Sequence, residues 1–286
     1  GDGKNRPEFI LSRNSPGFDV DYPADKGKSK YMFWFTGGIV EDENHIPDAN
    51  AGTFYSAMSN VNITIEDGNP AAVALRTHYA QHSFVNHIAI NIGKGRAGIF
   101  DIGNEMEDLA FYGGEYGIIA TKASPGWQVM MVDAYFEGQR KAALKTQESG
   151  LAIVNMQVKN VPMVFDIDDN YWEKIYIENG RFENVSGPAF NIAVENNSNN
   201  SITLRDIWCS NVPVLAAYKR TGEQTKVSYK TYHVKSFDHG LQMESLVDIP
   251  QYKTLLSAEP AAKLPAAIQS VLPALPQMSE WKNLRE

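Results

Sequence analysis

The sequence lacks three features that would have assigned it to well-defined classes of protein. It has a single cysteine, Cys209, which excludes a disulfide framework within the chain and a cysteine-rich zinc site. It has no run of about 18 apolar residues, which excludes a membrane-spanning helix. Basic residues are outnumbered, because 26 Lys and Arg stand against 34 Asp and Glu and give a formal net charge of −8. We therefore expect neither nucleic acid nor membrane as a partner.

What the chain does have is apolar residues in a repeating pattern. Its 286 residues are 43% hydrophobic and 11% aromatic, which is enough to bury a core and argues against disorder. In the middle of the chain, a short motif of alternating apolar residues that ends in a small or polar residue occurs six times. Aligning the phrases on one apolar position gives steps of 19, 25, 22, 24 and 26 residues between Ile92, Phe111, Phe136, Val158, Phe182 and Trp208.

Steps of this length, with alternation inside each unit, predict an all-β fold, a right-handed parallel β-helix of the pectate-lyase-like kind with irregular flanking segments. The six aligned residues then stack in one internal ladder. Left-handed backbone is expected just after the ladder, at Gly113, Gly138, Asn160, Asn184 and the pair Ser210-Asn211. An antiparallel sandwich would show turns at about half this spacing, and a leucine-rich repeat would need a leucine frame that is absent.

The flanks of the repeat predict the domain organisation. Residues 1–55 are expected to form an irregular lead-in or cap, and residues 56–235 the β-helix. Residues 236–286 are expected to form a proline-rich connector, with a short helix around Ala266–Leu272.

Two motifs favour a structural reading. Gly93–Gly98 matches the glycine pattern of dinucleotide-binding proteins, but another strand follows it where that fingerprint requires a helix. Cys209 has no histidine or aspartate beside it in the sequence, so we interpret it as a structural residue and not as a nucleophile.

Polar residues after one predicted strand are candidates for lining a groove. Arg76, His78 and Gln81 lie together in the sequence, and His82 follows four residues after His78. On a β-strand, two histidines at this spacing are too far apart to share one metal ion easily. A solvated turn is the alternative reading for all of these residues.

The densest acidic and aromatic cluster of the repeat region lies after another predicted strand. If Phe165 and Ile167 face the core, Asp166 and Asp168 face solvent, with Asn170 and Trp172 close behind. Two carboxylates beside a tryptophan suit a sugar-cleaving site, and they would equally suit a calcium ion. A polar turn between coils is the third reading.

Several phrases of the sequence resemble glycoside hydrolase family 55, the laminarinase-like exo-β-1,3-glucanases of the pectate-lyase-like superfamily. The resemblance covers about half of the chain and is carried by Phe54–Ile65, Thr77–Ser83, Gly98–Gly114 and Val164–Trp172. It implies two β-helices in tandem, with this chain as the first, a glucan pocket between them and inversion of configuration. It also implies that the general acid lies on the second β-helix, outside this chain. Gln81 matches a polar position that organises water in the family, whereas His78 departs from the expected glutamine.

These observations lead to a functional hypothesis. We expect part of a secreted or periplasmic glycoside hydrolase that acts on β-1,3-glucan-type polysaccharide and needs no cofactor. Gln81, His78 and Asp168 are the expected catalytic residues, and Arg76, Asp166, Asn170 and Trp172 the expected substrate contacts. The alternatives are a calcium-dependent polysaccharide lyase and a non-catalytic glycan-binding, adhesin or fibre solenoid.

Overall fold

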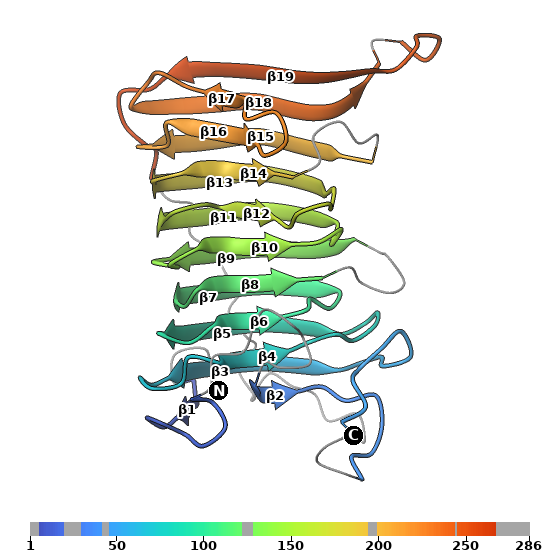
Figure 1. Cartoon of the computed structure of the whole chain (residues 1–286), viewed down its shortest axis with the longest axis vertical. Coiled ribbons are helices and arrows are strands. Elements are labelled where there is room, and N and C mark those ends of the chain that lie inside the picture. The colour runs from blue at the N-terminus through green and yellow to red at the C-terminus, as the bar shows by residue number, and fades with distance from the viewer. Residues whose placement is uncertain are drawn as a thin grey trace, which may run out of the picture.

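The chain folds into a parallel β-solenoid, as the sequence predicts. The computed structural model describes residues 6–19, 30–41, 46–121, 128–193, 199–243 and 245–266, and these residues contain strands and no helix. Two sheets run the length of the molecule, and successive coils are stacked along its long axis (Figure 1). None of the described residues forms a helix that could cross a membrane.

The first sheet, sheet A, contains ten strands in the order in which the coils stack. They are β1 (Glu8–Leu11), β3 (Ala57–Ile65), β5 (Phe84–Gly93), β7 (Glu105–Gly113), β9 (Val129–Glu137), β11 (Leu151–Val161), β13 (Lys174–Val185), β15 (Ser201–Ser210), β18 (Thr231–Gln242) and β19 (Gln251–Pro260).

The second sheet, sheet B, contains nine shorter strands. They are β2 (Lys30–Trp34), β4 (Ala72–Arg76), β6 (Ala97–Phe100), β8 (Tyr116–Ala120), β10 (Ala142–Thr146), β12 (Phe165–Ile167), β14 (Pro188–Ile192), β16 (Val214–Tyr218) and β17 (Gln224–Lys226). From β3 to β16 the chain alternates between the sheets, so each coil gives one strand to each, and the ladders within each sheet are parallel.

The predicted alignment of the internal ladder is confirmed for the four central residues and is wrong for the residue at each end. Phe111, Phe136, Val158 and Phe182 pair in succession as predicted. At the first end, the partner of Phe111 is Ile90 and not Ile92. At the last end, the partner of Phe182 is Cys209 and not Trp208. Because neighbouring residues of a strand face opposite sides, this one-residue slip places Cys209 in the core and Trp208 on the outer surface.

The bends predicted after the ladder are confirmed. Gly113, Gly138, Asn160, Asn184 and Asn211 all have left-handed backbone, with φ between 53° and 76°. The asparagines also bond to one another across coils. The Asn184 side-chain amide donates to Asn160 Oδ1 at 2.9 Å, and that of Asn211 donates to Asn184 Oδ1 at 2.7 Å. The same position therefore both turns the backbone and links successive coils.

A second column of left-handed residues, which the sequence analysis did not identify, lies within the strands of sheet A. One such residue occurs in each strand from β3 to β15, with φ between 50° and 58°. The column consists of Asn60, His87, Asp108, Asp133, Asn155, Asn179 and Asp206. Short polar side chains tolerate this conformation best, and each one bends its strand into two parts.

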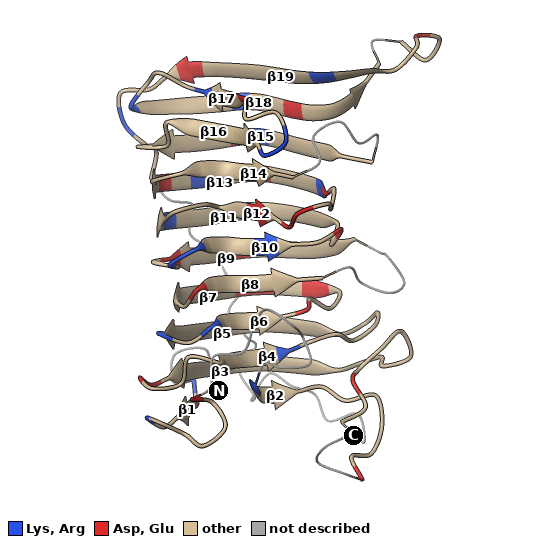
Figure 2. Cartoon of the chain, in the orientation of Figure 1, with Lys and Arg blue, Asp and Glu red and all other residues tan. Residues whose placement is uncertain are grey.

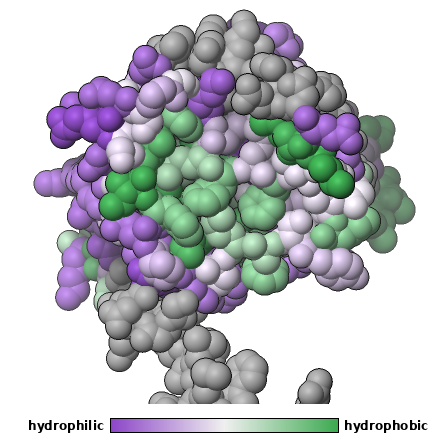
Figure 3. Space-filling model, turned by 90° about the horizontal axis from the view of Figure 1, so that it is seen from below, coloured by the Kyte–Doolittle hydropathy of each residue, from purple (hydrophilic) through white to green (hydrophobic). Residues whose placement is uncertain are grey.

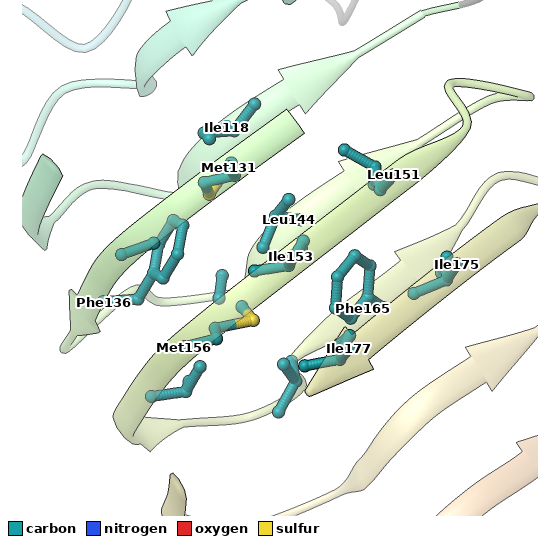
Figure 4. Packing of buried hydrophobic residues seen from close by; sticks show 14 of the residues in the cluster. Ile118, Met131, Phe136, Leu144, Leu151, Ile153, Met156, Phe165, Ile175 and Ile177 are labelled. Carbon is teal, nitrogen blue, oxygen red and sulfur yellow. The ribbon is translucent and has the colours of Figure 1, made fainter. Parts of the chain in front are cut away.

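The lumen between the sheets is filled by apolar side chains in layers (Figure 4). The rings of Phe111 and Phe136 stack with centroids 4.8 Å apart and planes 10° from parallel. The opposite wall must leave room for them. A Cβ on Gly98 would lie 2.6 Å from the Phe111 ring, and one on Gly117 would lie 2.5 Å from the Phe136 ring. Large residues in sheet A are thus matched by glycines in sheet B.

The flanks differ from the predicted domain boundaries. Within residues 1–55, β1 and β2 already pair in parallel with β3 and β4, so the lead-in begins both sheets. The predicted boundary at residue 235 falls inside β18, and β18 and β19 add two antiparallel strands to sheet A where a connector was expected. Apart from Ala266, the helix expected around Ala266–Leu272 lies outside the described residues.

The end of the solenoid that β1 and β2 form is apolar. Figure 3 looks at this end, and hydrophobic residues gather across it. Phe9 of this terminal strand, which pairs with the buried Ile63, is 43% exposed. This end of the core is therefore only partly covered.

Replacing Phe136 with alanine tests the stacked core. Phe136 is fully buried against Phe111, so its loss should lower the free energy of unfolding by about 3–5 kcal/mol, measured by denaturant titration. Val132→Ala on the same strand is the control, because Val132 is 37% exposed and should change stability by under about 1 kcal/mol. Equal stability of the two variants would contradict the placement of Phe136 in the lumen.

Candidate functional site

The candidate residues all lie on the outer face of sheet B or in the loops that follow its strands. The pairing of neighbouring strands connects Arg76 of β4 through Phe100, Ile119 and Lys145 to Asp166 of β12. Figure 2 shows charge on β4, β10 and β12 and none on β6 and β8 between them. Four strand spacings of about 4.8 Å separate Arg76 from Asp166 by about 19 Å. The candidates therefore form two groups and not one pocket.

The first group is centred on Arg76. Its Nε donates to Asp48 Oδ1 and its Nη1 to Asp101 Oδ2, both at 2.9 Å, while Nη2 binds the other oxygen of Asp48. The guanidinium also lies over the rings of Tyr31, Trp34 and Phe100 at 5.3–5.9 Å. The Arg76 side chain is 2% exposed. This argues against its predicted role as a substrate contact, because a guanidinium that is almost completely buried has no surface left for substrate.

Asp48 connects Arg76 to His78. Trp34 Nε1 donates to Asp48 Oδ1 at 2.7 Å, and His78 Nδ1 lies 3.3 Å from Asp48 Oδ2. Burial disfavours the charge on Asp48, but the hydrogen bonds from His78, Arg76 and Trp34 outweigh it and hold the pKa of Asp48 well below its ordinary value of 3.8. The group is thus an ion-pair network that joins the loop before β3 to β4.

Gln81 and His82 point to different neighbours. Gln81 is half-buried, and its Oε1 is buried with no hydrogen-bond partner among the described residues. The ring of His82 stacks on Tyr55 at 5.2 Å. Since His78 binds Asp48, the two histidines do not share a ligand.

The second group contains the two aspartates predicted to face solvent. Phe165 and Ile167 are fully buried, which confirms the predicted alternation, and the side chains of Asp166 and Asp168 are 18% and 26% exposed. Asp166 Oδ1 lies 3.1 Å from Lys219 Nζ and accepts from Asn191 Nδ2 at 3.0 Å.

Asp168 has partners of its own. Its Oδ1 lies 3.0 Å from Lys145 Nζ, and Gln147 donates to its other oxygen. Lys219, which pairs with Asp166, also donates to the Ile167 carbonyl at 2.7 Å and so connects β12 to the end of β16. Each carboxylate is therefore held by a different lysine.

Aromatic side chains flank this group. Trp172 is half-buried in the loop after β12, and Asn170 in the same loop is exposed with φ of 67°. Tyr116 of β8 lies under the ammonium groups of Lys141 and Lys145, at 5.6 and 5.9 Å. Burial raises the pKa of Tyr116, and the charges of Asp166, Glu115 and Asp168 raise it further. The group thus presents carboxylates and lysines on one face, with the buried Tyr116 ring beneath the lysines and Trp172 in the following loop.

A calcium ion does not fit this donor set. Lysine ammonium groups lie 3.0–3.1 Å from Asp166 Oδ1 and Asp168 Oδ1, and their positive charge would repel a calcium ion bound there. No group of three or more His, Cys, Asp or Glu residues that could hold a metal ion occurs in the described part of the chain. The second group is better suited to hydrogen bonding than to metal binding.

Glu173 is a buried carboxylate that the sequence analysis missed. It is fully buried and accepts from the backbone N–H groups of Ser149, Gly150 and Lys174 at 2.9–3.1 Å. Burial raises its pKa, and these backbone hydrogen bonds partly offset the effect. It joins the turn before β11 to the start of β13 and has no open face for substrate.

A row of residues on the outer face of sheet A was also missed. Tyr135, Gln157, Arg181 and Trp208 pair in succession across β9, β11, β13 and β15. Each one directly precedes the residue of its strand that lies in the internal ladder. The alternation could have revealed the row, had the last coil been aligned on Cys209 instead of Trp208.

Comparison with known proteins adds no relative. No model of a known protein family matches the chain, and a search of curated proteins finds none with significant similarity.

The ion-pair network around Asp48 predicts a pH dependence of stability. Because the pKa of Asp48 is lowered on folding, its contribution to stability is present above the ordinary pKa of 3.8 and is lost as the pH falls below it. Asp48→Asn should therefore flatten the fall in melting temperature of the parent protein between about pH 5 and pH 3.

The matched control is Asp67→Asn, which removes an aspartate paired with Lys94 on the exposed surface. This variant should keep the acid slope of the parent. A parental slope in Asp48→Asn would contradict the proposed contribution of Asp48.

Proposed function

We propose that the chain is a carbohydrate-active β-helix protein that binds polysaccharide on the outer face of sheet B, at Asp166, Asp168, Asn170 and Trp172. One observation carries the proposal: two partly exposed carboxylates lie two residues apart in sequence at β12, each held by a lysine, and a half-buried tryptophan lies in the loop that follows. Carboxylates accept hydrogen bonds from sugar hydroxyls, and an indole ring offers a flat apolar surface to the C–H face of a sugar.

The reaction class we propose is glycoside hydrolysis with inversion. In this proposal Asp168 orients water or sugar, and the general acid comes from a second β-helix of the same protein. The polymer is a β-1,3-glucan-type polysaccharide, and the protein is secreted or periplasmic. These finer points rest on the resemblance in sequence.

Gln81 and His78 have a different place in this proposal. Four strand spacings separate their coil from that of Asp168, so they do not act on the same glycosidic bond. If they contact the glycan, they do so several sugar units away along the chain.

A second candidate function is glycan binding without hydrolysis. The observation that favours it is that both aspartates are already bound to lysines, as in a surface built to orient hydroxyl groups. Reducing-sugar release from laminarin by this chain joined to the proposed second β-helix separates the two functions, because only the hydrolase releases new chain ends.

Trp172→Ala tests the proposed site. Removing the stacking surface should weaken laminarin binding roughly three- to tenfold in titration calorimetry, a change of about 0.6–1.4 kcal/mol. Tyr229→Ala is the control, because Tyr229 is an exposed aromatic residue (47%) on another part of the surface. The proposal is wrong if the parent protein does not bind laminarin, or if both variants bind it equally well.

A further inference from the structure

The row on the outer face of sheet A has the composition of a binding surface. Across neighbouring strands it presents Tyr135, Gln157, Arg181 and Trp208, and it continues to His233 of β18. None of these residues belongs to the groups on sheet B.

Contacts along the strands hold these side chains in defined orientations. The Tyr135 hydroxyl donates to Glu137 at 2.7 Å, and Arg181 Nε donates to Glu183 at the same distance. Trp208 Nε1 donates to Asp206 at 3.1 Å. The Trp208 ring also stacks on His233, with centroids 4.2 Å apart and planes 9° from parallel. A surface that is ordered before binding loses less entropy when a ligand arrives.

The row is hollowed into a groove across the strands. One cavity of about 210 Å³ is lined by Gln157, Arg181 and Trp208, and a second of about 190 Å³ is lined by Tyr135, Gln157 and Arg181. Because Gln157 and Arg181 line both, the two cavities are direct neighbours, and together they form the groove. It runs along the stacking direction of the coils.

One wall of the groove shows what Arg181 and Trp208 can contact. Pro265 and Ala266 line the cavity beside Trp208, and Arg181 Nη1 donates to the Pro265 carbonyl at 2.7 Å. This wall thus brings a neutral acceptor oxygen and an aliphatic surface to the cavity that the indole ring also lines. A sugar ring offers the same combination of oxygen acceptors and C–H groups.

The charges of the groove favour a neutral ligand with hydroxyl groups. Charged residues of both signs line it: Arg181 and Lys159 are basic, and Glu183 and Asp206 are acidic. An anionic or cationic polymer would meet repulsion along part of its length. The two carboxylates accept hydrogen bonds, which the hydroxyls of a sugar can donate and a proline residue cannot.

We propose that this groove binds a neutral oligosaccharide across β9, β11, β13 and β15, with Trp208 as the stacking platform and Arg181 as a hydrogen-bond donor. The ligand takes the place of the Pro265 carbonyl at Arg181 and displaces Pro265 and Ala266, which line the cavity beside Trp208. The site is separate from the one proposed on sheet B and does not depend on it.

The test is titration of the full chain with a β-1,3-linked glucose hexasaccharide and with a β-1,4-linked one. Trp208→Ala and Arg181→Gln should each weaken binding of at least one of them about three- to tenfold, while Trp208→Phe retains most of the affinity. Tyr176→Ala is the matched control, because Tyr176 lies on the same strand as Arg181 and makes a similar contact, to Glu178 at 2.8 Å. Melting curves show whether each variant is folded. If Trp208→Ala is unfolded, the binding measured with Arg181→Gln decides the test.

A second variant tests the displacement. Replacing Pro265 and Ala266 with glycine should weaken the packing of this segment in the groove. Oligosaccharide binding should then tighten roughly two- to fivefold, because displacing the segment costs less free energy. The Trp172→Ala background separates the two sites, since it weakens binding at sheet B and should leave the effect of Trp208→Ala intact. The proposal is overturned if neither hexasaccharide binds in that background. It is also overturned if the groove variants bind like Tyr176→Ala, or if only a proline-rich peptide binds there.

Discussion

The fold depends on the parallel register between successive coils. This register places a residue directly over its equivalent in the next coil, about 4.8 Å away, along the whole solenoid. Inside, like packs on like, as Phe111 does on Phe136 and Phe165 on Phe190. Outside, the same stacking would bring like charges together. The paired positions Glu137, Lys159 and Glu183 alternate in sign, which avoids this repulsion.

The register also determines which residues can share a site. Residues close in sequence belong to one coil, whereas a site must draw on neighbouring coils, at spacings of about 20 residues or more. The group around Arg76 and the group around Asp166 share a face but lie four strands apart, so they remain separate. Tyr135 and Trp208 are far apart in sequence, yet they belong to one row because only two strands, β11 and β13, lie between β9 and β15.

The sequence predicted the solenoid, the centre of its ladder and the left-handed bends, because apolar alternation and Gly or Asn at turns are local signals. It failed where two local signals conflicted. Aligning the last coil on its largest apolar residue selected Trp208, although alternation assigns the inner position to Cys209. Pro250 and Pro260 suggested a linker, but they stand just before β19 and at its last residue, where a strand tolerates proline. The partners of Arg76 come from distant segments, which no local pattern reveals.

Lys219 on sheet B and Arg181 on sheet A are paired in different ways, and this affects what the surface around each can bind. On sheet B, Lys219 reaches from the end of β16 to Asp166 and to the Ile167 carbonyl, so the ion pairs connect coils and stabilise the stack. A ligand that recruits these carboxylates must compete with bonds that the fold uses. On sheet A, Tyr135 and Arg181 are paired with carboxylates on their own strands. Those pairs stay intact when a neighbour across the groove changes, so this face can exchange Pro265 for a ligand at little cost to the solenoid.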